Sequence, residues 1–196
     1  MSKIALAIHG GAGTLVQGMM TPEKEKAYKK ALQLALDSGY KILENGGSSI
    51  DAVEKAVQEL ENSHLFNAGK GSVFTATETH EMDASIMDGN SLNAGAVSLI
   101  TGIKNPVSLA RDVMDKTEHV FLAGNGAIEF AKEVDYEIEN SDYFYDEFRH
   151  NQWLEIKDTD SFQLDHAKKK DSKFGTVGAV ALDKDGNIAA QLLREE

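Results

Sequence analysis

The chain has 196 residues, a length that fits one domain with a sizeable core, and its hydrophobic content of 41% is typical of a soluble globular protein. It has 20 Lys and Arg against 32 Asp and Glu, and the resulting net charge of -12 argues against a nucleic-acid or anionic-membrane partner. It has no cysteine, which excludes disulfides, thiolate catalysis and Cys-ligated zinc. Because the N-terminal apolar stretch is too short for a signal peptide and no run reaches membrane-spanning length, we predict a cytoplasmic protein.

The first third of the chain predicts a strand followed by two helices. Ile4–Ile8 is a short apolar run typical of a buried strand, and a glycine-rich turn ends it. Thr21, with Pro22 after it, predicts a helix start, and the apolar stripe of that helix stops at Gly46-Gly47. Ser48 or Ser49 is expected to cap a second helix. The core-facing positions of this second helix are Ala52, Val53, Ala56, Val57 and Leu60.

The middle of the chain predicts strands and turns, then shorter helices. Residues 66–99 are rich in Gly, Thr, Ala and Asn, a composition that favours strand and turn. The expected elements are strands at Ser72–Thr75, Met82–Gly89 and Ala94–Ile100, a helix from Pro106 through Met114, a strand at Val120–Leu122 and a helix at Gly126–Glu133.

The regular pattern fails from Val134 to Lys173, where acidic and aromatic residues alternate irregularly before a lysine-rich run. We interpret residues 134–173 as a surface arm and a mobile linker. Beyond it, Thr176–Leu182 and Asn187–Ala190 predict two strands, with a hairpin turn at Asp183–Gly186 between them.

The junction between Gly175 and Thr176 is the most informative point in the sequence. A threonine hydroxyl is a poor nucleophile unless a base lies beside it, and cutting the chain just before Thr176 would free an α-amino group to serve as that base. Gly175 suits such a cut, because a residue without a Cβ tolerates strained backbone. The alternative is that Thr176 is an ordinary β-branched residue at the start of a strand.

Two other motifs predict less. His9-Gly10-Gly11-Ala12-Gly13 resembles the glycine-rich oxyanion loop of esterases, but the chain lacks the Gly-x-Ser-x-Gly elbow, which leaves a strand-to-loop turn as the simpler interpretation. His80-Glu81 begins like a zinc-protease helix, but the position of the second histidine is Ala84.

The loop at Leu60–Gly71 has more than one possible role. Asn67 could offer its amide to an oxyanion, or could bond its own backbone in an Asx turn. A loop of this kind can also aim several carbonyls inward and hold a hard cation.

Taken together, five sequence motifs resemble those of a known family. HGGAGT, GGSSIDAVEKAV, LFNAGKGSVFTATETHEMDASIMDGNSLNAGAV, NPVSLAR and GTVGAVALDKDGNIAA occur in an order and spacing that resemble plant-type L-asparaginases, also called isoaspartyl aminopeptidases, of the N-terminal-nucleophile hydrolases. The resemblance spans residues 4–190 except the arm at 134–173. It implies an α+β fold, an αββα sandwich, made as a precursor that cleaves itself into an α part (1–175) and a β part that begins at residue 176.

The same resemblance implies an activity and site residues. The family hydrolyses L-asparagine and β-aspartyl dipeptides without a catalytic cofactor, as a homodimer of αβ units. Thr176 matches the nucleophile, with its α-amino group as the general base, and Asn67 matches an active-site asparagine. The residues that match a loop whose main-chain oxygens hold a structural Na⁺ are Leu60, Glu61, Ser63, Phe66, Ala68 and Lys70.

The resemblance ends with the tail at 191–196. After DGNIAA the family continues Ala-Thr-Ser-Thr-Gly-Gly, whereas this chain reads QLLREE, a change that one missing nucleotide in suitable codons would produce. No position here matches the rest of the family's β part. We therefore expect a sandwich incomplete at the C-terminal side, with exposed strand edges and an apolar face to which Leu192 and Leu193 add, and no activity of the chain alone. The alternative is a non-catalytic remnant that acts as a folding or hetero-oligomer partner.

Overall fold

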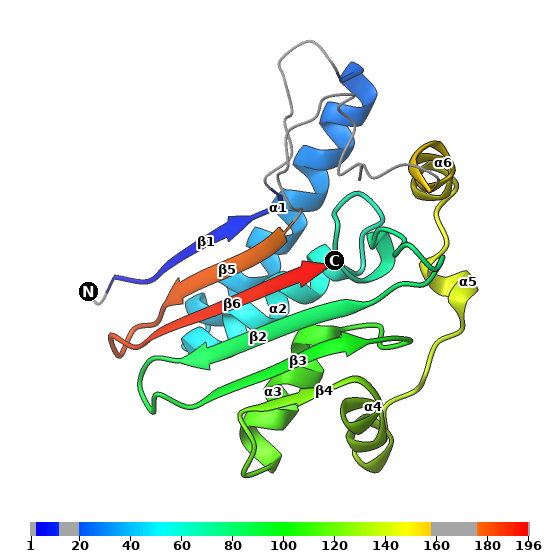
Figure 1. Ribbon diagram of the computed structural model, residues 1–196. Coiled ribbons are helices and arrows are strands. Elements are labelled where there is room, and N and C mark those ends of the chain that lie inside the picture. The colour runs from blue at the N-terminus through cyan, green and yellow to red at the C-terminus, as the bar shows by residue number, and fades with distance from the viewer. Residues whose placement is uncertain (1–2, 12–19, 158–175, 196) are drawn as a thin grey trace.

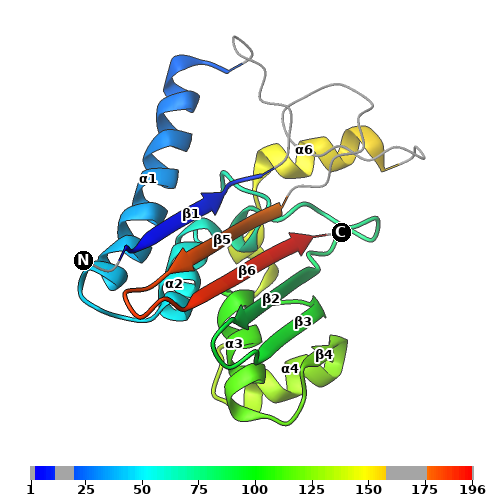
Figure 2. The same ribbon diagram turned by 90° about the vertical axis from the view of Figure 1, so that its left-hand side faces the viewer.

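The computed structural model describes residues 3–11, 20–157 and 176–195, which form a mixed α/β fold around one six-stranded sheet (Figures 1 and 2). The strands are β1 (Ala5–His9), β2 (Met82–Asp88), β3 (Ala94–Ile100), β4 (Phe121–Ala123), β5 (Thr176–Leu182) and β6 (Ile188–Glu195). The helices are α1 (Pro22–Glu44), α2 (Ser49–Glu61), the short 3-10 helix η1 (Gly69–Gly71), α3 (Pro106–Lys116), α4 (Gly124–Glu133), α5 (Ser141–Phe144) and α6 (Glu147–Ile156).

The C-terminal hairpin lies in the middle of the sheet, whose order is β1-β5-β6-β2-β3-β4. Strand β5 pairs with β1, where His9 lies opposite Gly178, and β6 pairs with β2 along its length. All neighbours are antiparallel except β3 and β4. The expectation that the hairpin would expose sheet edges is therefore wrong, because the outer strands are β1 and β4.

The helix starts expected from the sequence are confirmed. Thr21 Oγ1 accepts a hydrogen bond from the Lys24 amide at 3.3 Å, and Ser48 Oγ, not Ser49, accepts one from the Asp51 amide at 3.3 Å. All five predicted core positions of α2 are buried. Strand β1 differs from expectation, since it is an outer strand with alternating exposure and not a buried one.

The first part of residues 134–173, interpreted above as a surface arm, is more regular than its sequence pattern indicates. This segment contains α5 and α6, and it is anchored to the body of the protein by Phe144, which is 2% exposed, and by Arg149, whose Nε donates to the Gly71 carbonyl at 3.2 Å. Residues 158–173 of the predicted linker lie outside the described residues. The expected strand at Ser72–Thr75 is wrong, because that stretch is loop.

The two faces of the sheet differ. Helices α1, α2 and α3 lie on one face, and the face toward the viewer in Figure 1 carries no helix of the described part. On β6, Ala189 and Leu193 are buried, whereas Ile188 and Leu192 are 58% and 52% exposed on the opposite face. An exposed apolar face is thus confirmed, but Leu193 belongs to the core and does not add to it.

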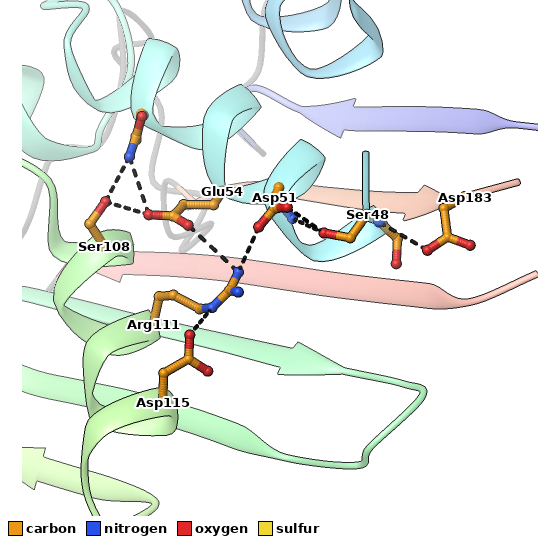
Figure 3. A network of polar contacts seen from close by, with 9 residues as sticks. Ser48, Asp51, Glu54, Ser108, Arg111, Asp115 and Asp183 are labelled. Atoms are coloured by element: carbon orange, nitrogen blue, oxygen red, sulfur yellow. Dashed lines mark hydrogen bonds and ion pairs between the residues drawn. The ribbon is translucent and has the colours of Figure 1, made fainter. Parts of the chain in front are cut away.

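Polar contacts join α2, α3 and the β5–β6 turn on the helical side (Figure 3). Arg111 of α3 forms ion pairs with Asp51 and Glu54 of α2. At the start of α2, the Ser49 amide donates to Asp183 Oδ2 at 3.1 Å, and Asp183 Oδ1 accepts from the amides of Asp185 and Asn187. One buried carboxylate therefore closes the hairpin turn and also stabilises a helix N-terminus.

We expect Asp183→Asn to destabilise the protein in a pH-dependent way. Burial alone would raise the pKa of Asp183, but the amides of Asn187, Ser49 and Asp185 outweigh it and lower that pKa below its ordinary value. Near neutral pH, losing the carboxylate acceptor should lower the free energy of unfolding by about 2–4 kcal/mol. A group with a lowered native pKa stabilises the fold above its unfolded pKa, so the difference should shrink as pH falls below about 4.

Urea denaturation of both proteins across this pH range measures the effect. Asp185→Asn in the same turn is the matched control, because Asp185 is exposed and should change stability little. A difference between Asp183→Asn and the parent that stays constant into the acid range would contradict the assignment.

We expect Gln191→Met to stabilise the protein. Gln191 of β6 is 4% exposed, and neither its Nε2 nor its Oε1 has a hydrogen-bond partner among the described residues. Methionine fills a similar volume without a polar group to desolvate, so the free energy of unfolding should rise by about 1–3 kcal/mol. Urea denaturation measures it. Gln58→Met is the control and should be destabilising, since Gln58 Nε2 donates to Ser108 Oγ at 2.7 Å.

Candidate active site

Thr176 is the first residue of β5 and lies half-buried at one end of the sheet. Strand β1 ends beside it, because His9 pairs with Gly178, and β6 ends beside it on the other side, because Thr176 pairs with Arg194. The loop between α2 and β2 lies at this same end of the sheet (Figure 1). The structure therefore places Thr176 where several chain ends and loops meet.

The turn after β1 connects Thr176 to the loop that carries Asn67. A Cβ at Gly10 would lie 3.0 Å from Phe66 Cε1, and one at Gly11 would lie 4.0 Å from the Thr176 carbonyl oxygen. Gly11 also has a φ of 132°, which favours glycine. These glycines let the backbone pass between Phe66 and Thr176, so three segments far apart in sequence meet there. Ala12 and Gly13 of the motif, like Gly175 of the predicted cleavage site, lie outside the described residues.

Asn67 is 5% exposed, and its two amide atoms differ in their contacts. Its Oδ1 accepts a hydrogen bond from the Val73 amide at 2.9 Å. This contact is not the Asx turn considered above, because Val73 lies six residues further along the chain. A backbone N–H can only donate, so it fixes which end of the side-chain amide is the oxygen. Nδ2, the donor, has no hydrogen-bond partner within the described part of the chain.

The residues matched to the sodium loop lie in one continuous stretch. Leu60 and Glu61 end α2, Ser63, Phe66 and Ala68 lie in the following loop, and Lys70 lies in η1. Gly69 has a φ of 52°, and a Cβ there would lie 2.6 Å from the Glu61 carbonyl oxygen. A Cβ at Gly71 would collide with the Phe66 carbonyl oxygen.

Beside the side-chain oxygens of Glu61, Ser63 and Asn67, this loop offers main-chain oxygens as possible donors. Because glycine occupies positions 69 and 71, these oxygens can approach closely, and carbonyl oxygen is the donor type that hard cations take. No group of three or more His, Asp or Glu side chains in the described ranges could hold a metal ion. A cation held by main-chain oxygens of this loop therefore stays a prediction.

The Glu61 side chain has a separate structural role that the sequence did not reveal. Its carboxyl group is fully buried, and it accepts hydrogen bonds from the Val107 amide and from Asn105 Nδ2, both at 2.9 Å. Burial raises the pKa of this group to about 8. Glu61 thereby joins the end of α2 to the start of α3, and its position is set by both helices.

A family profile described as Asparaginase matches residues 2–191. The chain belongs to the asparaginase family. Over 193 residues, which are 97% of this chain and 60% of the relative, it is 45% identical to an isoaspartyl peptidase of Escherichia coli (strain K12). It is 40% identical over 198 residues to a plant-type L-asparaginase of Pyrococcus abyssi (strain GE5 / Orsay), covering 95% of this chain and 61% of that one.

An isoaspartyl peptidase/L-asparaginase of Rattus norvegicus is 44% identical over 188 residues, 95% of this chain and 54% of the relative. The chain thus spans less than two thirds of the length of these curated relatives. Position 194, paired with Thr176, is Arg where the resemblance to the family implies Thr.

We expect Gly69→Ala to destabilise the protein by about 1–3 kcal/mol, because an L side chain is strained at this positive φ and its Cβ meets the Glu61 carbonyl oxygen. Thermal and urea denaturation measure the change. Gly126→Ala in α4 is the matched control: a Cβ there meets nothing within 4 Å, and alanine should stabilise the helix by about 0.5–1 kcal/mol. Equal effects of the two substitutions would contradict the proposed crowding at Gly69.

Proposed function

We propose that this protein carries the catalytic core of a threonine-nucleophile amidohydrolase that acts on L-asparagine and β-aspartyl peptides. It would be made as a precursor that is cut between Gly175 and Thr176. The single observation that carries this is the placement of Thr176 at the start of a central strand, joined through Gly10 and Gly11 to the loop of Asn67. The names of the relatives support the substrate class.

The chemistry needs a nucleophile, a base and an oxyanion donor. After the cut, the α-amino group of Thr176 would take the proton from its own Oγ1, and the oxygen would attack the side-chain amide carbon of the substrate. Negative charge would then develop on the carbonyl oxygen. As the C–N bond breaks, the α-ammonium group would return the proton to the leaving nitrogen, and water would hydrolyse the ester on Thr176 to release aspartate. Asn67 Nδ2 is a donor of the type that stabilises such a charge, and the Val73 amide holds the side chain in place from its other end.

A structural Na⁺ would bind to main-chain oxygens of the loop formed by Leu60, Glu61, Ser63, Phe66, Ala68 and Lys70. Its contribution when bound would be to hold this loop rigid. The loop carries Asn67, so the residues that bind the ion would also fix the position of the oxyanion donor. No cofactor takes part in the proposed reaction.

The exposed apolar face supports a proposal for the rest of the fold. Val180, Ile188 and Leu192 are 49%, 58% and 52% exposed on the face that the described helices leave open. We propose that in a complete αββα sandwich a second sheet packs on this face, that such αβ units pair as a homodimer, and that the 196-residue chain is inactive alone. The cytoplasmic location stays a prediction.

The same exposed face favours a second candidate function. A chain with this face open and Arg at position 194 could serve without catalysis as a folding or hetero-oligomer partner of an intact relative. Such a partner would cover the apolar face by binding a complementary sheet.

The test compares this chain with a chimera in which residues 1–190 continue into the downstream part of the Escherichia coli relative. We expect the chimera to be cut before Thr176, as read by mass spectrometry, and to release aspartate from L-asparagine and β-aspartyl-leucine. Thr176→Ala should abolish both the cut and the release. The 196-residue chain should show no turnover above its own Thr176→Ala variant.

Asn67→Asp tests the oxyanion donor in the chimera, because Asp keeps an acceptor for the Val73 amide but loses the N–H donor. We expect kcat to fall by about a hundredfold to a thousandfold. Aspartate release that persists in the Thr176→Ala chimera would overturn the proposed nucleophile. A chimera that folds but remains uncut and inactive would favour the non-catalytic candidate.

A further inference from the structure

A cavity of about 450 Å³ lies apart from the proposed catalytic residues, since neither Thr176 nor Asn67 lines it. Three segments distant in sequence form its walls: the loop at 74–80, the turn at 101–102 and the region at 138–150 that contains α5 and the start of α6. Its volume lies within the range of sites for small organic molecules. The proposed amidohydrolase chemistry makes no use of it.

Aromatic rings make up much of the wall. Phe74, Phe144 and Tyr145 all line the cavity, and the Phe74 ring packs against Tyr145 at 6.3 Å between centroids and against His80 at 4.2 Å. Such rings bind apolar groups and also attract cations to their faces.

The charged groups of the lining are almost all of one sign. Glu78, Glu139 and Asp142 contribute carboxylates, and the described residues of the lining include no lysine or arginine. His150 Nε2 lies 3.0 Å from Glu78 Oε1. The lysines that lie over the neighbouring Tyr143 ring, Lys70 and Lys104, are not part of the lining. The cavity is therefore suited to a cation and repels an anion.

His80 is the buried polar group of this wall. It is 7% exposed, and its Nδ1 lies 3.0 Å from the oxygen of Ser72, which is itself fully buried. Burial lowers the pKa of His80, so the ring is neutral at physiological pH. Nε2 has no hydrogen-bond partner within the described residues, although a buried polar atom of this kind costs about 1–3 kcal/mol when unpaired.

We propose that this cavity binds a small organic ammonium ion that bears an apolar or aromatic group. The carboxylates accept the N–H donors of the ammonium, and the rings of Phe74, Phe144 and Tyr145 take up its apolar body. A bare metal ion fits less well, because the described His and acidic side chains do not form a group that could coordinate one.

The probe for the test is 2-phenylethylammonium, titrated into the full 196-residue chain at physiological salt. Its matched controls are 2-phenylethanol, which is neutral, and 3-phenylpropionate, which is an anion. Calorimetry should show the ammonium binding at least about tenfold more tightly than either control. In NMR spectra the ring resonances of His80 and His150 should shift on its addition, while those of His119, which does not line the cavity, stay in place.

The double variant Glu139→Gln, Asp142→Asn should weaken binding of the ammonium by about tenfold and leave binding of 2-phenylethanol unchanged. The control Glu118→Gln, Glu129→Gln makes the same change in net charge at exposed positions outside the lining and should change affinity by less than about twofold. Circular dichroism verifies that each variant is folded. No saturable binding at millimolar probe, equal binding of the alcohol, or an unaffected double variant would each overturn the proposal.

Discussion

The central position of the C-terminal hairpin is the constraint on which the rest of the structure depends. Strand β5 pairs with β1 and β6 pairs with β2, so without the hairpin the N-terminal strand would have no neighbour among the described strands, and their sheet would end at β2. The Asp183 carboxylate adds a link from the hairpin turn to α2. A new chain end made before Thr176 would thus begin a strand held on both sides, which favours a fixed position for its amino group.

This arrangement also explains why one face of the sheet is apolar and open. Strand side chains alternate between faces, and β5 and β6 bury Val177, Ala179 and Leu193 beneath the helices. The alternate residues, Val180 and Leu192 among them, must then face the other way. Apolar residues on both faces are the pattern of a strand covered on both sides, and this supports a two-sheet sandwich.

Local signals in the sequence predicted the helices well and long-range placement poorly. The caps at Thr21 and Ser48 and the apolar spacing of α2 are local features, so both helices followed from them. Helix α6 was missed because its buried contacts are polar, with Arg149 and Gln152 inside, and no apolar stripe marks it. The site residue Thr176 came from chemistry and family resemblance. The aromatic cavity could not be predicted from the sequence, since its walls come from three separate segments that meet only in the fold.

From Gln191 on, the chain differs from the continuation that the resemblance to the family implies, yet β6 runs on to Glu195. Strand β6 continues here because Leu193, at the inward parity, reaches the core, and the backbone ladder to β2 requires no particular side chain. Gln191 has the same inward parity but carries an amide into an apolar layer, where neither of its polar atoms is paired among the described residues. The resemblance to the family implies alanine at this position, a side chain without that cost. Strand formation and core compatibility are therefore separate requirements, and this segment meets the first more fully than the second.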